Sequence, residues 1–343
     1  MKKNTLLFII SLFSSLTIFA QKKFSLEILH ENKNTSIRGL SVVTDKIIWV
    51  SGSNGTVGRS VDGGETWKWY QVEGFEKNDF RDIEAFDAQT AVIMAIGEPA
   101  FILKTYNGGE SWKKVYENNQ PGMFLDAMEF WNDHSGIVIG DAIDGKMFIA
   151  RTFDGGQKWT ALKPELLPTV DTGEACFAAS GTNIRALDRD EACFITGGTQ
   201  SRFFFRDKAI KLPLLQGSGT TGANSIAIRD KHKRKGSKVF IVVGGDFTRD
   251  TLRTGNCAIT RDGGITWTEP QTPPFGYRSC VEYITKKQVI CCGTSGVDIS
   301  TDGGMNWMNI SSRSFHVVRK AKDGKTVFLA GKDGVIGKLK IQK

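Results

Sequence analysis

The stretch Ser60-Val-Asp62-Gly-Gly64-Glu-Thr-Trp67 carries the pattern that decides the fold of this 343-residue chain. Each copy has a hydroxyl residue, Asp or Asn two positions later, Gly two after that, and Trp three further on. The Asp or Asn accepts backbone N–H bonds within its own turn, and Gly supplies a positive φ. The pattern predicts self-contained hairpin turns built on Asp62, Asn107, Asp154, Asp262 and Asp302. The other four copies are Thr105-Tyr-Asn107-Gly-Gly109-Glu-Ser-Trp112, Thr152-Phe-Asp154-Gly-Gly156-Gln-Lys-Trp159, Thr260-Arg-Asp262-Gly-Gly264-Ile-Thr-Trp267 and Ser300-Thr-Asp302-Gly-Gly304-Met-Asn-Trp307.

The spacing of these turns predicts the architecture. Asp62 and Asn107 are 45 residues apart, Asn107 and Asp154 are 47, and Asp262 and Asp302 are 40. Asp154 and Asp262 are 108 residues apart, which is two periods with one turn missing. A period near 45 fits four short strands with their turns, which is one blade of a β-propeller.

Seven such units fill the chain. The fourth lacks the turn, but residues 176–179 and 192–196 are expected to form its first two strands. The seventh offers only three strands, at 316–320, 326–330 and 335–341, and residues 24–29 are free to supply the fourth. Joining both termini in one blade closes the ring and removes an exposed edge. We therefore expect an all-β, seven-bladed β-propeller of four-stranded antiparallel blades, closed by pairing of the N- and C-terminal strands.

The N-terminus has the pattern of a signal peptide. Lys2 and Lys3 precede an apolar stretch at 6–19, and Ala20 is a plausible cleavage point. We expect residues 1–20 to be removed and 21–343 to form one propeller domain, monomeric, in the periplasm or secreted. The next residue is Gln21, not Cys, so no lipid anchor is expected, and no later stretch is apolar enough to span a membrane. The formal charge of +8 is a moderate excess that indicates solubility first.

The six cysteines leave two interpretations open. They are small buried hydrophobic residues, or Cys176 pairs with Cys193, and Cys280 with Cys291 or Cys292, across hairpins. Neither they nor the four His have metal-ligand spacing, and no cofactor fingerprint is present, so no metal or cofactor is expected. The basic run 231–235 lacks interleaved aromatic residues and is expected to be a solvated loop, not a nucleic-acid site.

Three arginines occur at the start of the innermost strand of a unit. Arg38, Arg81 and Arg278 precede the Asp or Asn of their turns by 24, 26 and 24 residues. This spacing predicts one structural position in three blades, at the mouth of the axis. The Asp and Asn turns should lie on the opposite face of the ring, because they join the third and fourth strands.

Acidic side chains are expected at the same rim. Glu98, Asp141 and Asp246 follow second strands, whereas Asp82, Asp126 and Glu174 come from first strands. Two readings stay open: a lattice in which the arginines pair with Asp82, Asp126 and Asp141, or an anion site with a carboxyl group free for proton transfer. In the second reading the acid–base candidates are Asp82, Asp126, Asp141 and Glu174. The ligand-binding candidates are then Arg38, Arg81, Arg278, Glu98, Asp246, Tyr277 and His316.

The repeated turn is similar to the Asp-box, or bacterial neuraminidase repeat. The whole mature chain resembles the bacterial propellers related to the photosystem II stability and assembly factor, in phrases such as Arg38-Gly-Leu-Ser41, Phe80-Arg-Asp-Ile83 and Gly276-Tyr-Arg-Ser279. Others are Gly140-Asp141, Gly173-Glu-Ala-Cys-Phe-Ala-Ala-Ser180 and Gly244-Gly-Asp246. The resemblance implies seven blades and a binding protein, with a ligand changed from the photosynthetic one.

The sequence leaves two functions open for this protein. The first is a binding or assembly-factor-like propeller that recognises an acidic protein, glycan or small molecule through the arginine rim. The second is a glycoside hydrolase or lyase acting on a carboxylated sugar. Sialidases share the boxes and an arginine triad, but they have six blades, and here Arg38 is followed by Gly39-Leu40, not by Ile-Pro. Some relatives are labelled oxidoreductases, but this sequence contains no cofactor-binding motif.

Overall fold

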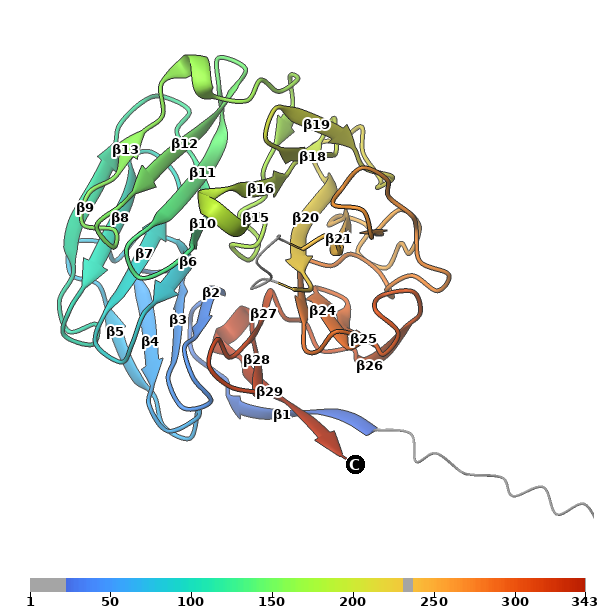
Figure 1. The fold of residues 1–343 in the computed structure, drawn as a ribbon. Helices are drawn as coiled ribbons and strands as arrows, with labels where there is room; N and C mark the ends of the chain where they lie inside the picture. Colours follow the sequence, from blue (N-terminus) through green and yellow to red (C-terminus); the bar gives the residue numbers. More distant parts are fainter. Residues whose placement is uncertain (1–22, 231–236, 343) are drawn as a thin grey trace, which may run out of the picture.

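Seven small antiparallel sheets surround a central axis in the computed structural model, which describes residues 23–230 and 237–342 (Figure 1). The expected all-β, seven-bladed propeller is confirmed. The expected signal peptide at 1–20 and the basic run at 231–235 lie outside the described residues. Within the described ranges, no helix is long and apolar enough to cross a membrane.

In blades 1, 2, 3, 4 and 6 the four strands pair in chain order, with the first strand innermost. Blade 1 has β2 (Ile37–Val42), β3 (Ile48–Gly52), β4 (Thr56–Ser60) and β5 (Lys68–Gln71). Blade 2 has β6 (Phe80–Ala85), β7 (Ala91–Ala95), β8 (Ala100–Thr105) and β9 (Lys113–Asn118). Blade 3 has β10 (Leu125–Phe130), β11 (Gly136–Ile143), β12 (Lys146–Thr152) and β13 (Thr160–Ala161). Blade 4 has β15 (Ile184–Ala186), β16 (Ala192–Ile195), β18 (Arg202–Phe205) and β19 (Lys208–Lys211).

The remaining blades complete the ring. Blade 5 has β20 (Thr221–Ile228), β21 (Phe240–Asp246) and β22 (Cys257–Thr260), and the short β17 (Gly197–Gly198) and β14 (Glu174–Ala175) extend its inner edge. Its outer strand is reduced to a bridge between Ile259 and Thr268. Blade 6 has β23 (Cys280–Tyr283), β24 (Val289–Gly293), β25 (Gly296–Ser300) and β26 (Trp307–Ser311). Three short 3-10 turns lie in connections, at Pro164–Leu166, Asp188–Asp190 and Lys332–Gly334.

Blade 7 joins the two ends of the chain. It contains β27 (Val317–Lys320), β28 (Val327–Ala330), β29 (Ile336–Gln342) and, outermost, β1 (Lys23–His30). The register of β1 against β29 runs from Lys23 opposite Gln342 to His30 opposite Ile336. Phe24 is buried in the core that blade 7 shares with blades 1 and 6. The expected closure is therefore confirmed, and β1 covers the outer edge of β29.

The five Asp-boxes share the hydrogen bonds of their hydroxyl residue, and four of them, all but the box that ends at Trp159, add a bond from the Trp indole. In the first, the Ser60 hydroxyl donates to Asp62 Oδ1 at 2.8 Å and accepts from the Gly64 N–H at 2.9 Å. The Trp67 indole donates to the Gly64 carbonyl at 3.2 Å. Gly64 has φ +90°, and a Cβ there would lie 2.6 Å from Leu29 of blade 7, so glycine is required by conformation and by packing.

The fourth blade corrects one expectation. Its innermost strand is β15, at Ile184–Ala186, and not residues 176–179, whereas β16 falls within the expected 192–196. Both segments are buried and short, so the hydrophobic pattern alone cannot separate them. The register does, because Ile184 pairs with Phe194, which pairs in turn with Phe204. Residues 176–182 instead leave the sheet and cross the axis, as described below.

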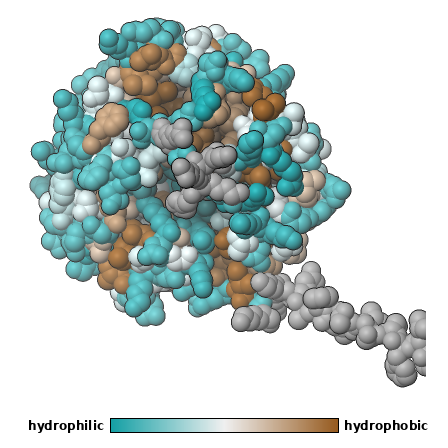
Figure 2. Space-filling model, in the orientation of Figure 1, coloured by the Kyte–Doolittle hydropathy of each residue, from teal (hydrophilic) through white to brown (hydrophobic). Residues whose placement is uncertain are grey.

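The core lies between neighbouring sheets, where six clusters of buried apolar side chains follow the seams of the ring. Apolar side chains that reach the face shown in Figure 2 form separate patches with hydrophilic side chains between them. All six cysteines are buried as free thiols, in line with the first of the two interpretations. The described ranges contain no cluster of His, Cys, Asp or Glu that could hold a metal ion.

Candidate functional site

The ring has two faces with different chemistry. The five boxes lie at turns between the third and fourth strands, and we call this side the box face. The opposite side is formed by the connections between blades and by the turns between second and third strands, and we call it the arginine face. First strands begin on the arginine face, so their initial residues surround the mouth of the axis.

A β-bulge turns one residue of the first strand toward this mouth. The pairing register shifts at Arg38 in blade 1, Arg81 in blade 2, Asp126 in blade 3 and Asn224 in blade 5. A bulge leaves the extra residue unpaired and re-aims its side chain. The four polar side chains thus share one structural position, and the sequence alignment of Arg38 with Arg81 is correct.

Arg38 and Arg81 lie close to each other with little negative charge to balance them. The Arg81 Nε pairs with Asp79 Oδ2 at 2.8 Å. Arg38 donates to the Ala179 carbonyl at 3.2 Å and makes no ion pair with any described residue. Burial, and then the charge of Arg81, lower the pKa of Arg38. Burial and the charges of Arg38 and Arg81 lower the pKa of His316 to about 3, so its imidazole is neutral at physiological pH.

Arg278 does not share this position, which corrects the predicted triad. It lies one residue earlier in its strand, because the hairpin after Cys292 in blade 6 is one residue shorter than the hairpin after Ser51 in blade 1. Arg38 and Arg278 both precede the Asp of their box by 24 residues, yet their positions on the first strand differ by one residue. The Arg278 side chain points into its own blade, where Nε and Nη2 pair with Asp298 Oδ2 at 2.7 and 2.6 Å. Both side chains are fully buried, so this pair is structural.

The other predicted ligand-binding residues divide into two groups. Tyr277 is near Arg38, and its hydroxyl donates to Asn224 Oδ1 at 2.8 Å. Burial raises the pKa of Tyr277. Glu98 and Asp246, in contrast, are held by nearby connections: Glu98 by the connection from blade 2 to blade 3, and Asp246 by its own loop. Glu98 accepts from the Gly122 N–H, and Asp246 accepts from Thr248 and pairs with Arg249 at 2.8 Å.

Asp126 and Asp141 form a buried carboxyl pair beside Arg81. Burial, and then the neighbouring Asp141, raise the pKa of Asp126 well above its usual value. Burial raises the pKa of Asp141 to about 6, although Asp141 Oδ1 accepts from the Cys176 N–H at 3.0 Å. Like charges in one buried site disfavour ionisation of both, so we expect the pair to keep one proton between its two carboxyls near neutral pH.

The remaining two acid–base candidates are held in structural contacts. Asp82 accepts from the backbone N–H groups of Ile83 at 2.9 Å and Met128 at 2.7 Å, and burial raises its pKa to about 8. The Glu174 carboxylate is fully buried and binds both Arg202 Nε, at 2.8 Å, and Arg202 Nη2. Neither group has a free oxygen edge at the mouth, so the structure does not bring all four carboxyls together.

A segment of the chain itself closes the axis. Residues 176–182, which we call the plug, contact six blades. The Ser180 hydroxyl donates to the Ser279 carbonyl at 2.7 Å, and Arg319 Nη2 donates to the Ser180 carbonyl at 2.9 Å. Further contacts of the plug are Arg38 to Ala179, Thr182 to Ser225, Cys176 to Asp141, and Gly181 against Asp82. The plug separates the arginine face from the channel behind it.

Behind the plug, the axis widens into a cavity of about 470 Å³ that opens toward the box face. Its charged lining was not found from the sequence. One position of the first strand supplies Glu84, Glu129, Arg185, Glu282 and Arg319, each paired with the equivalent residue of the second strand. Aligning the first strands three residues beyond the arginine position would have revealed this set of acidic and basic side chains, because residues at one register position of the first strands face the axis together.

The fold and the boxes define a seven-bladed Asp-box β-propeller. A family model described as photosynthesis system II assembly factor YCF48 matches residues 21–205, more than half of the chain. The chain belongs to this family. No curated protein matches it in sequence.

Solved structures agree on the fold. The chain is similar to YCF48 bound to a D1 peptide, with a TM-score of 0.63 and 18% identity over 91% of this chain and 94% of that one. It is equally similar to YCF48 from Cyanidioschyzon merolae, with a TM-score of 0.63 and 18% identity over 92% and 98%. The WD40 domain of Neurospora crassa Pan2 has a TM-score of 0.59 and 12% identity over 89% of each chain. At these identities the likeness concerns the fold alone.

Proposed function

We propose that this protein binds an acidic segment of a protein partner at the mouth of the axis on the arginine face, through Arg38 and Arg81. One of the similar YCF48 structures holds a D1 peptide, which supports a peptide as the class of ligand. The signal-peptide pattern at residues 1–20 supports a site of action in the periplasm or outside the cell. An acidic glycan or small molecule is the alternative ligand for the same two arginines.

One observation carries the proposal. Of the two neighbouring guanidinium groups, only that of Arg81 has an ion pair, with Asp79, whereas Arg38 has no ion pair with a described residue. Arginines that merely fill a channel are expected to be neutralised by the chain's own acids, as Arg278 is by Asp298. The unpaired charge at the mouth therefore favours binding of an external carboxylate over a closed lattice.

The geometry suits a carboxylate. A guanidinium presents parallel N–H donors that match the two oxygens of a carboxylate, and partial burial strengthens such bonds. The neutral His316 imidazole adds a hydrogen-bonding group that brings no further charge. Because the plug lies directly behind this mouth, the ligand is held at the surface and does not enter the channel.

The test is binding of a fluorescein-labelled peptide of alternating Glu and Ala, measured by fluorescence anisotropy at low salt. We expect Arg38→Gln with Arg81→Gln to weaken binding at least about tenfold for each arginine lost, since a charge-assisted bond is worth about 1.5–3 kcal/mol. Arg261→Gln, an exposed box-face arginine, is the matched control and should bind normally. Normal binding by the double variant, or equal affinity for a Gln-Ala peptide, would refute the proposal.

A second candidate, hydrolysis or elimination on a carboxylated sugar, has one observation in its favour. The proton shared by Asp126 and Asp141 lies beside Arg81, where an acid and a carboxylate clamp would be needed. The pair is buried, however, and Asp141 also anchors the plug. We therefore rank binding without turnover first. Release of methylumbelliferone from its glucuronide or sialoside, abolished by Asp126→Asn, would reverse this order.

A further inference from the structure

An aromatic patch lies on the arginine face beside the mouth of the axis. It consists of the rings of Phe247 in the loop after β21, Phe177 in the plug and Tyr277 in the connection into blade 6. Phe247 contacts both of the others edge to face, with ring centroids 6.1 Å from Phe177 and 6.2 Å from Tyr277. Phe247 is nevertheless 43% exposed, although phenylalanine is among the residues most often buried in proteins.

The loop holds Phe247 in a fixed place. The Phe247 N–H donates to the Thr220 carbonyl at 3.2 Å. The carboxylate of the preceding residue, Asp246, accepts from the N–H and the hydroxyl of Thr248, at 3.0 and 2.7 Å, and pairs with Arg249. A side chain on such a loop loses little conformational freedom when a ligand covers it, so its exposed apolar area favours binding.

Two connections place the patch next to Arg38. The first is Tyr277, whose ring contacts Phe247 and whose hydroxyl donates to Asn224 at 2.8 Å. Asn224 occupies in blade 5 the bulge position that Arg38 occupies in blade 1. The second is the plug, which carries Phe177 and, two residues later, the carbonyl that accepts from Arg38. An extended segment whose carboxylate binds Arg38 therefore has a side chain one or two residues away within reach of Phe247.

The positive charge beside the patch is not balanced by the loop that carries Phe247. Residues 246–253 include two Asp and two Arg, so the loop adds no net charge. Arg38 has no ion pair with a described residue, and Asp79 is already paired with Arg81. Apolar area and an unpaired guanidinium are thus side by side on one face.

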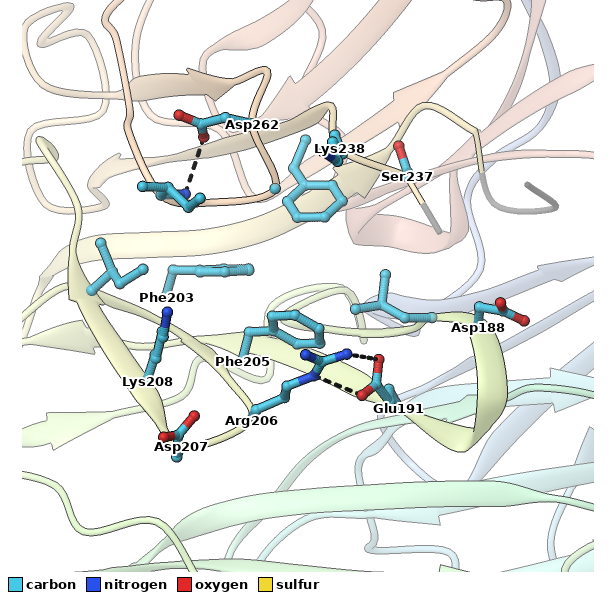
Figure 3. A pocket seen from close by; sticks show the side chains of 15 residues that line it. Asp188, Glu191, Phe203, Phe205, Arg206, Asp207, Lys208, Ser237, Lys238 and Asp262 are labelled. Atoms are coloured by element: carbon cyan, nitrogen blue, oxygen red, sulfur yellow. Dashed lines mark hydrogen bonds and ion pairs between the residues drawn. The ribbon is translucent and has the colours of Figure 1, made fainter. Parts of the chain in front are cut away.

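An apolar surface without such a charge does not identify its occupant. The groove of about 570 Å³ between blades 4 and 5 also has exposed aromatic area, at Phe205, but Glu191 is paired there with Arg206 (Figure 3). The other charged residues of its lining include both acids and lysines, so charge favours neither an anion nor a cation. At the mouth of the axis, in contrast, Arg38 favours a carboxylate, and the patch favours a particular neighbour of that carboxylate.

We propose that the aromatic patch determines the specificity of the peptide site: the partner segment carries a large apolar side chain one or two residues from the carboxylate that Arg38 holds. This inference rests on the proposed function and narrows it. The carboxylate fixes the orientation of the segment, and burial of the apolar side chain against Phe247 contributes affinity. A glycan has no such side chain, so the patch favours a protein ligand.

The probe is the same fluorescein-labelled Glu-Ala peptide with one central Ala replaced with Leu. We expect it to bind at least about tenfold more tightly than the parent peptide, since each buried methylene group contributes about fourfold in affinity. A peptide with Ser in place of that Ala should bind no more tightly than the parent. Equal affinity of the Leu peptide and the parent overturns the proposal.

Variants of Phe247 locate the gain. With Phe247→Ala, the Leu peptide should bind as the parent peptide does, and the affinity of the parent should change by less than about twofold. Phe247→Leu should keep most of the gain, because it keeps the apolar area. Phe153→Ala on the box face is the matched control: Phe153 is 65% exposed, and both affinities should stay unchanged. A gain that persists in Phe247→Ala overturns the proposal.

The arginine variant separates failure of this inference from failure of the proposed function. Arg38→Gln with Arg81→Gln should weaken binding of the Leu peptide and of the parent alike. If the gain from Leu requires the two arginines but not Phe247, the patch has no role and the proposed function stands. If both peptides bind normally to the arginine variant, the proposed function fails, and this inference fails with it because the patch is then a general apolar surface.

Discussion

Gly181 is the residue at which the plug comes closest to the wall of the axis. Its φ is +63°, and a Cβ there would lie 2.3 Å from the carboxyl carbon of Asp82. We expect Gly181→Ala to lower the free energy of unfolding by roughly 2–4 kcal/mol, from backbone strain and overpacking together. Urea denaturation measures the change.

Gly217 is the matched control for this prediction. It also has a positive φ, of +107°, but a Cβ there would meet nothing within 4 Å. Gly217→Ala should therefore cost only the conformational part, roughly 1 kcal/mol. An equal effect of the two substitutions would contradict a tightly packed plug.

The carboxyl pair predicts a pH dependence of stability. The pKa of Asp141 is about 6 in the folded protein, above its value in an unfolded chain, so the folded state binds the proton more tightly. Its contribution to stability is full below about pH 4 and is lost as the pH rises toward 6. Asp126→Asn removes the repulsion, because an amide carries no charge and donates to Asp141.

We therefore expect Asp126→Asn to be more stable than the parent above about pH 6, by on the order of 1–2 kcal/mol, and to differ less near pH 4. Thermal unfolding at both ends of this window provides the comparison. Asp82, whose pKa is also raised, is present in both proteins, so its contribution to the pH dependence of stability cancels in the comparison. Parallel stability curves for the two proteins would show that the pair does not share a proton.

At the scale of single residues, the sequence correctly places Arg38 and Arg81 at one position of the first strand, and it misplaces Arg278. Residue counts measured from the box assume equal hairpins, and a hairpin shorter by one residue turns the side chain from the axis into the sheet. Asp298, the ion-pair partner of Arg278, lies in the third strand, and nothing in the sequence marks it as that partner. The raised pKa values of Asp126 and Asp141 could not be predicted from the sequence either, because burial of the two carboxyls is their main cause.

Among the elements, the Asp-box allows a sharp substitution test. Asp154 Oδ1 accepts from the Thr152 hydroxyl and from the N–H groups of Gln157 and Lys158. Asp154→Ala removes these acceptors and should lower the Tm by roughly 1–3 °C. Asp154→Asn should be nearly neutral, because Asn107 accepts from the hydroxyl and from a backbone N–H in the box of blade 2. Differential scanning calorimetry distinguishes them, and equal losses would assign the effect to charge.

The boxes and most strands follow from local patterns, whereas the fourth blade does not. Its first strand has only three residues and no box to count from. The plug has no local signature either, since its contacts are with residues of six other elements far along the chain. A single sequence shows the periodicity of the strands within a blade, but it does not show which residues an irregular segment contacts.

For the whole molecule, the pairing of β1 with β29 predicts the effect of truncation. A chain beginning at residue 32 would lose Phe24 from the core and expose the edge of β29. Compared with a chain beginning at residue 21, we expect a Tm lower by on the order of 10 °C and light scattering from edge-to-edge association. A monomeric truncated protein with unchanged Tm would show that closure contributes little.

The closing blade also fixes when the ring can be completed. Its outermost strand is the first to leave the ribosome and its neighbour is the last, so no partial chain contains the full blade. Growing chains usually fold domain by domain from the N-terminus, yet here residues 23–30 must wait for residues 336–342. The waiting strand is an unpaired edge throughout synthesis. A holding partner that keeps this edge covered until the chain is finished would therefore raise the yield of folded protein.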